Sequence, residues 1–148
     1  SLLSRARMPA FARHFLFVLG LLLGSARVGA EVLVVTGIRS NPVSLDRERI
    51  EAIYLGRTIH LTDGTELTPL DLPNGPTRDE FYFKLTGKNP VQIRAHWSRM
   101  VFTGRALPPR EAESPAQVRQ WLLESPDRIG YLDRNDNTAG LRILLRLP

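Results

Sequence analysis

Three closely spaced residues, Gly75, Thr77 and Arg78, have the chemistry needed to hold a small anion. They lie where an Asn74-Gly75-Pro76 turn runs into a predicted helix, and a helix start exposes free N–H groups and the positive end of the dipole. Gly75 lets the backbone approach closely, the Thr77 hydroxyl can donate, and the Arg78 guanidinium can grip two oxygens at once. We therefore predict that phosphate or a similar oxyanion binds at this helix start.

A purely structural interpretation of the same segment is also open. Thr77 and Glu80 match a capping box, in which each side chain accepts from a free backbone N–H of the helix start. Arg78 then points into solvent. Pro76 favours this interpretation, because proline has no N–H and removes one donor from an anion cradle.

Two further polar residues, Ser40 and Asn41, follow a predicted strand over residues 31–37. In open α/β sheets, ligands bind outside the carboxyl ends of the strands. Ser40 and Asn41 are therefore candidates to face the same anion. The alternative is that they form an ordinary turn before Pro42.

Strands and helices alternate along the region that must position these residues. The β-branched apolar run 31–37 is typical of a strand buried on both faces, as in a parallel sheet. Asp46, Asn89 and Ser114 are typical helix caps, and Gly56 and Gly87 are placed to end helices. The alternation predicts an α/β domain with helices on a sheet. Predicted strands cover residues 31–37, 58–62, 66–72, 128–132 and 141–147, and predicted helices cover 46–55, 77–86, 89–101 and 114–122.

Two packing details accompany these elements. Asp63-Gly64 is a strong hairpin signal and predicts that strands 58–62 and 66–72 pair with each other. The helix that begins after Asn89 is expected to bury Ile93, Trp97 and Val101.

The first 30 residues have the pattern of a secretory signal. Basic residues precede the apolar run 15–24, which is shorter than the roughly 20 residues of a membrane-spanning helix. Val28-Gly29-Ala30 supplies the small residues of a cleavage site, and Met8 is a candidate start. We expect export to the periplasm, cleavage after Ala30 and one domain over residues 31–148; the alternative is an uncleaved anchor.

Charge and composition exclude several function classes. The chain has 20 basic and 15 acidic residues, but four arginines and no acidic residue precede Glu31, so residues 31–148 carry a net charge of only +1. A nearly neutral domain lacks the dense positive field of nucleic-acid binding. The absence of cysteine excludes disulfides and thiolate sites in this chain.

Neither a metal site nor a catalytic site is expected. His60 and His96 are isolated, and the run Asp133, Asn135, Asn137 lacks the glycine and the glutamate of a calcium loop. No nucleophile elbow, P-loop or metalloprotease motif occurs in the sequence. We therefore expect a protein without a cofactor that is not an enzyme.

Several segments, taken in order, resemble one family. Asn41-Pro42-Val43, residues 53–57 (IYLGR) and residues 78–82 (RDEFY) are followed by residues 97–104 (WSRMVFTG), Pro108-Pro109 and residues 129–133 (IGYLD). This ordered set resembles the small phosphate-binding-like periplasmic proteins of the type 2 periplasmic binding protein superfamily.

The resemblance implies a single three-layer lobe with a mixed sheet flanked by helices. It implies binding of inorganic phosphate for uptake, and a membrane transporter or another periplasmic protein as partner. A second hypothesis is a non-catalytic interaction or scaffold protein that retains the lobe and has lost the ligand. The sequence does not specify an oligomeric state.

Overall fold

The computed structural model describes residues 30–40, 45–61 and 63–148. Nearly all of the predicted signal, and Asn41, lie outside these ranges, and no helix within them is long and apolar enough to cross a membrane. The elements run in the order β1 (Val32–Gly37), α2 (Arg47–Tyr54), β2 (Thr68–Asp71), α3 (Pro76–Thr86), α4 (Pro90–Phe102), β3 (Arg110–Glu111), α5 (Pro115–Glu124), β4 (Arg128–Asp133) and β5 (Leu141–Leu147).

The five strands form one mixed sheet in the order β3-β2-β4-β1-β5. β2 is parallel to β3 and β4, whereas β1 is antiparallel to both of its neighbours, β4 and β5. The prediction that residues 31–37 are buried on both faces is confirmed, since all six residues of β1 are buried. The expectation of parallel neighbours is wrong, because the apolar pattern reports burial and not strand direction.

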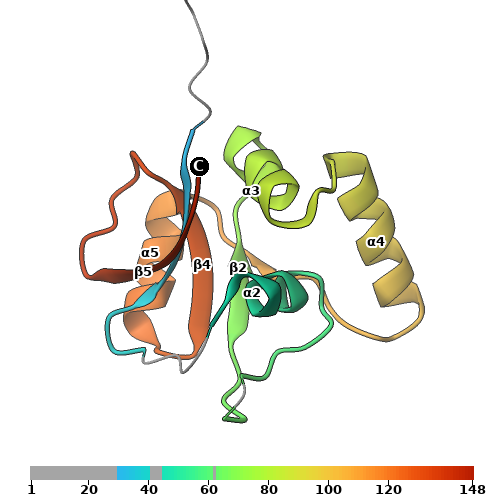
Figure 1. The fold of residues 1–148 in the computed structure, drawn as a ribbon, viewed down its shortest axis with the longest axis horizontal. Coiled ribbons are helices and arrows are strands. Elements are labelled where there is room, and N and C mark those ends of the chain that lie inside the picture. The colour runs from blue at the N-terminus through green and yellow to red at the C-terminus, as the bar shows by residue number, and fades with distance from the viewer. Residues whose placement is uncertain (1–29, 41–44, 62) are drawn as a thin grey trace, which may run out of the picture.

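Helices cover both faces of the sheet, as Figure 1 shows. Adjacent strand residues point to opposite faces, and β4 demonstrates this directly. A Cβ at Gly130 would lie 2.9 Å from Val118 of α5, whereas the ring of Tyr131 lies 6.0 Å from the ring of Tyr54 of α2. α5 therefore packs on one face, α2 and α3 pack on the other, and α4 lies outside them against α3.

Local chemistry explains most of the helix boundaries. Asp46 and Ser114 accept from the third helical N–H of α2 and α5, and Asn89 forms a complete capping box with Gln92 at the start of α4. Gly87 ends α3 in the left-handed conformation (φ 73°). These predicted boundaries are confirmed.

The predicted capping box of α3 is wrong. The helix begins at Pro76, with Gly75 as N-cap, and no side chain caps it within the part of the chain that the structure describes. Thr77 is therefore the second helical residue. The fixed φ of proline suits the first helical position, which moves the helix start one residue ahead of the threonine.

Two packing predictions, the hairpin strand before Asp63 and the burial of Val101, are also wrong. Among residues 58–61, the described part of the predicted strand 58–62, His60 forms an isolated antiparallel bridge to Glu66 in place of a full hairpin strand. Val101 is 49% exposed, although Ile93 and Trp97 of the same helix are buried as expected.

Candidate functional site

The predicted anion-binding residues lie at the carboxyl edge of the parallel strands. β2 ends at Asp71 and β3 at Glu111, and the chain then enters α3 and α5 respectively. A shallow depression of about 200 Å³ lies between these helix starts, lined by Gly75, Thr77, Arg78 and Pro115 among others. The structure therefore brings Gly75, Thr77 and Arg78 together, in the kind of place where α/β sheets bind ligands.

The start of α3 offers backbone donors to this depression. Its first helical hydrogen bond joins Asp79 N–H to Gly75 C=O at 3.0 Å. The N–H groups of Thr77 and Arg78 precede that bond, and no side chain caps them among the described residues. Pro76 contributes no donor. Two N–H groups and the Thr77 hydroxyl are thus available to an anion.

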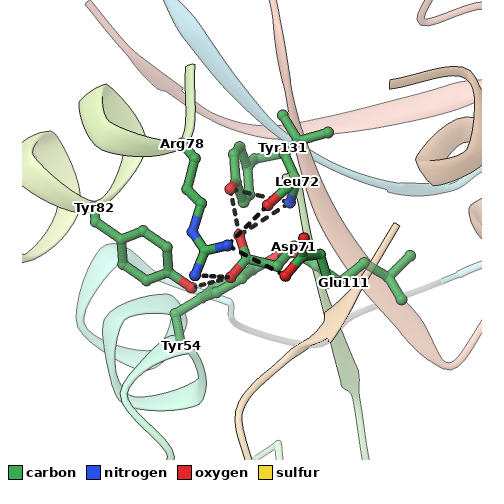
Figure 2. A network of polar contacts seen from close by, with 8 residues as sticks. Tyr54, Asp71, Leu72, Arg78, Tyr82, Glu111 and Tyr131 are labelled. Carbon is green, nitrogen blue, oxygen red and sulfur yellow. Dashed lines mark hydrogen bonds and ion pairs between the residues drawn. The ribbon is translucent and has the colours of Figure 1, made fainter. Parts of the chain in front are cut away.

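The Arg78 side chain turns inward, and Figure 2 shows its partners. Nη1 donates to the backbone oxygen of Leu72 at 3.1 Å and lies 3.5 Å from the Glu111 carboxylate, while Nη2 lies 3.6 Å from Asp71 Oδ2. Only 19% of the side chain is exposed. The interpretation that Arg78 points into solvent is therefore wrong. The guanidinium ties the ends of β2 and β3 to the start of α3.

Asp71 is the centre of a buried polar network that sequence reasoning missed. Its carboxylate accepts from the Tyr82 hydroxyl at 2.7 Å, from the Tyr131 hydroxyl and from Leu72 N–H at 3.0 Å. The Tyr131 hydroxyl also accepts from Leu72 N–H at 3.2 Å. The one sequence signal was an aspartate near the end of the predicted strand 66–72, which by itself does not reveal its partners.

Aromatic rings enclose this network from the α2 and α3 side. Phe81 stacks on Tyr131 with ring centroids 3.7 Å apart, and Tyr54 meets Phe81 edge to face at 4.7 Å. The Tyr54 hydroxyl donates to the backbone oxygen of Leu70 at 2.9 Å. The rings exclude water and fix the hydroxyl positions, so the carboxylate at the end of β2 is held in one orientation.

Burial controls the ionisation of the side chains in the network around Asp71. Burial raises the pKa of Asp71 above its ordinary value, although Arg78 and the hydrogen bonds from Tyr131 and Tyr82 oppose the rise. Burial, reinforced by the charge of Asp71, raises the pKa of both tyrosines well above the usual range, so both remain neutral donors. Burial alone would lower the pKa of Arg78, but the negative charge of Asp71 raises it overall, and Arg78 stays cationic.

The raised pKa of Asp71 predicts an unusual pH dependence of stability. A carboxyl group that is harder to ionise in the folded state contributes stability below its unfolded pKa of about 3.9, and this contribution is lost as the pH rises through the folded pKa. The free energy of unfolding of the wild type, relative to Asp71→Asn, should therefore fall as the pH rises above about 4. Urea unfolding of both proteins at several pH values measures this difference. A relative stability that rises with pH would contradict the prediction.

Ser40 does not join this site. A backbone hydrogen bond to Gly37 places it in the turn directly after β1. β1 runs antiparallel to β4, and Thr36 pairs with Ile129 near the start of β4, so the carboxyl end of β1 lies at the opposite edge of the sheet. The expectation that Ser40 faces the same anion is wrong. It assumed a parallel first strand. Asn41 follows Ser40 and lies outside the described residues.

The remaining polar candidates have structural roles. His96 Nε2 lies 2.8 Å from the backbone oxygen of Leu55, and His60 pairs with Glu66 at 3.1 Å. In the turn after β4, Asp133 Oδ1 accepts from Asn135 N–H. Across the described ranges, no group of three or more acidic, histidine or cysteine side chains could hold a metal ion.

Comparison with solved structures relates this fold to known proteins. No family model and no curated protein matches the sequence. An ABC-type phosphate transport receptor from Vibrio cholerae is similar over 78% of this chain, with a TM-score of 0.58 and 14% identity. A putative phosphate ABC transporter substrate-binding protein from Clostridium perfringens, solved with bound phosphate, is similar over 78% of this chain, with a TM-score of 0.59 and 12% identity.

The chain has a phosphate-binding-protein-like fold. It spans less than half the length of either solved chain, 46% and 45% respectively. The fold class predicted from the sequence, an α/β lobe with a mixed sheet flanked by helices, is confirmed. At 14% and 12% identity the likeness establishes the fold alone. A shared fold does not imply a shared ligand, so ligand binding must be argued from the residues of the site.

Proposed function

We propose that this protein is a periplasmic solute-binding protein that takes phosphate or a similar oxyanion at the start of α3. The observation that carries the proposal is the α3 N-terminus. It opens, without a side-chain cap among the described residues, into a depression lined by Gly75 and Thr77. The likeness to two phosphate transport proteins supports it. Export by residues 1–30 and delivery to a membrane transporter belong to the same proposal.

The anion is held mainly by the backbone. The N–H groups of Thr77 and Arg78 point along the axis of α3 toward its start, and the Thr77 hydroxyl adds a third donor. Gly75 has extended backbone (φ 166°, ψ 178°) and presents no side chain between the anion and these donors. Arg78 serves as a positioning residue, because its guanidinium is occupied by Asp71, Leu72 and Glu111. Water reaches an anion in this shallow depression, so we expect modest affinity.

Thr77→Asp separates binding from folding. A negative charge in the first turn of a helix favours the helix by about 0.3–1 kcal/mol, but here it also occupies the donors and repels the ligand. We expect at least a tenfold loss of phosphate affinity, about 1.4 kcal/mol, without a decrease in melting temperature. Isothermal titration with phosphate, and with sulfate for comparison, measures affinity, and thermal unfolding measures stability.

Gln120→Glu is the matched control. It adds the same charge at an exposed position of α5 and should leave phosphate affinity unchanged within about twofold. Equal affinity for phosphate in wild type and Thr77→Asp would rule out the α3 start as the site. Equal losses in both variants would indicate a diffuse charge effect.

A second candidate function is a non-catalytic interaction or scaffold protein. It is favoured by the charge balance at the depression, where Arg78 is already paired with two carboxylates, Asp71 and Glu111, and Asp79 adds a further negative charge in the first turn of α3. Such a site attracts anions less than a free arginine does. Titrations without heat for either phosphate or sulfate would favour this function. Phosphate binding that is sensitive to Thr77→Asp would exclude it.

A further inference from the structure

A second, larger depression lies where the C-termini of α2 and α4 converge. Its volume is about 660 Å³, and its lining includes Arg57, Arg99 and Arg105 together with Met100 and Phe102. It adjoins a neighbouring hollow lined by Arg57, Arg105 and Thr68 at the beginning of β2, so it lies at the other end of that strand from the α3 start. This second depression is separate from the proposed phosphate site.

Two identical helix endings place two of these arginines. At the end of α2, Gly56 has φ 72°, its N–H donates to Ile53 C=O, and Arg57 N–H donates to Ala52 C=O. At the end of α4, Gly104 has φ 66°, and the N–H groups of Gly104 and Arg105 donate to Val101 and Met100 in the same way. Both are Schellman endings, in which the residue after the left-handed glycine leaves the helix in a fixed direction. Arg57 and Arg105 are thus held by backbone geometry at the rim of one depression.

The charge around this depression is strongly one-sided. Residues 88–110 contain five basic residues and no acidic one, whereas the rest of the 31–148 region contains 11 basic and 15 acidic residues. The ion pairs found within the described ranges involve other side chains, and none joins Arg57, Arg99 or Arg105 to a carboxylate. The two helix C-termini offset only about one unit of positive charge in total. Three arginines therefore line one hollow, and no aspartate or glutamate is among its lining residues.

We propose that this depression is a binding site for polyvalent phosphate oxyanions, either free or as lipid headgroups. Three arginines around one hollow match a ligand that carries several phosphate oxygens, because a guanidinium binds such oxygens through two parallel hydrogen bonds. The hollow is more than three times the volume of the depression at the α3 start and accommodates a ligand larger than inorganic phosphate. Phe102, 93% exposed at its rim, offers an apolar surface to the uncharged part of an organic phosphate or a lipid.

Two titrations identify the source of the phosphate. One uses sodium tripolyphosphate in isothermal titration calorimetry at low ionic strength, where screening is weakest. The other uses co-sedimentation with phosphatidylglycerol–phosphatidylcholine vesicles, compared with pure phosphatidylcholine vesicles. We expect binding in at least one titration. Arg57→Gln, Arg99→Gln and Arg105→Gln should each weaken it about tenfold, since each removes a charge-assisted contact.

Arg134→Gln is the matched control, because Arg134 is exposed in the turn after β4 and its loss changes net charge equally. It should change affinity less than twofold. Thr77→Asp should also leave tripolyphosphate or vesicle binding intact, which separates this site from the one proposed at α3. No binding in either titration, equal weakening by Arg134→Gln, or loss of all binding in Thr77→Asp would each overturn the proposal.

Discussion

Asp71→Ala should lower the free energy of unfolding by about 3–5 kcal/mol, the range for removing one partner of a buried charged pair. The substitution leaves the Tyr82 and Tyr131 hydroxyls without the carboxylate to which they donate, and it deprives Arg78 of its buried counter-charge. It also leaves a cavity at the end of β2, where Asp71 is only 3% exposed. Urea unfolding at neutral pH measures the change.

Two variants test the cause of this loss. Asp127→Ala removes an exposed aspartate just before β4 and should change stability by no more than about 0.5 kcal/mol. Asp71→Asn keeps an oxygen that can accept from the tyrosines and should recover part of the loss. If Asp71→Ala cost as little as Asp127→Ala, the network would not stabilise the fold.

Gly56→Ala should destabilise the protein by about 2–4 kcal/mol through two separate effects. A side chain at φ 72° is strained, at a cost of about 1 kcal/mol. The new Cβ would also lie 2.8 Å from both Trp97 Cη2 and Ala106 Cβ, and such overpacking costs about 1–3 kcal/mol. Thermal and urea unfolding measure the sum.

Gly104→Ala isolates the backbone effect. Gly104 ends α4 in the same motif at φ 66°, but no atom lies within 4 Å of the position that a Cβ would take. We therefore expect only the cost of placing a side chain on a left-handed backbone, about 1 kcal/mol. A loss at Gly56 clearly larger than at Gly104 would assign the difference to the contacts with Trp97 and Ala106. Equal losses would mean that α4 moves away at little cost.

Helix boundaries were the most predictable part of this fold. Asp46, Asn89 and Ser114 cap helices through hydrogen bonds to residues three positions along, and the left-handed Gly87 ends α3. These contacts depend only on neighbouring residues, so residue types and spacing suffice to predict them. The prediction of where α3 begins was wrong because two local signals competed. Proline at the first helical position took precedence over the Thr77–Glu80 capping box.

Strand direction could not be predicted in the same way. A run such as residues 32–37 is apolar whether its neighbours are parallel or antiparallel, provided that both faces are covered. Only the pairing of β1 with β4 revealed that Ser40 lies at the edge of the sheet opposite the α3 start.

The sequence by itself determined most of the helix ends, the α/β layering and the presence of a helix after the turn that holds Gly75. These features follow from local hydrogen bonds and from the periodicity of apolar residues. Only the tertiary structure decided the partners of each charge. Asp71 meets Tyr131, 60 residues away, Arg78 meets Glu111, and Arg57 joins Arg99 and Arg105 around one hollow. Side chains on different elements come together only once the sheet order and the helix packing are fixed, and no local pattern encodes that order.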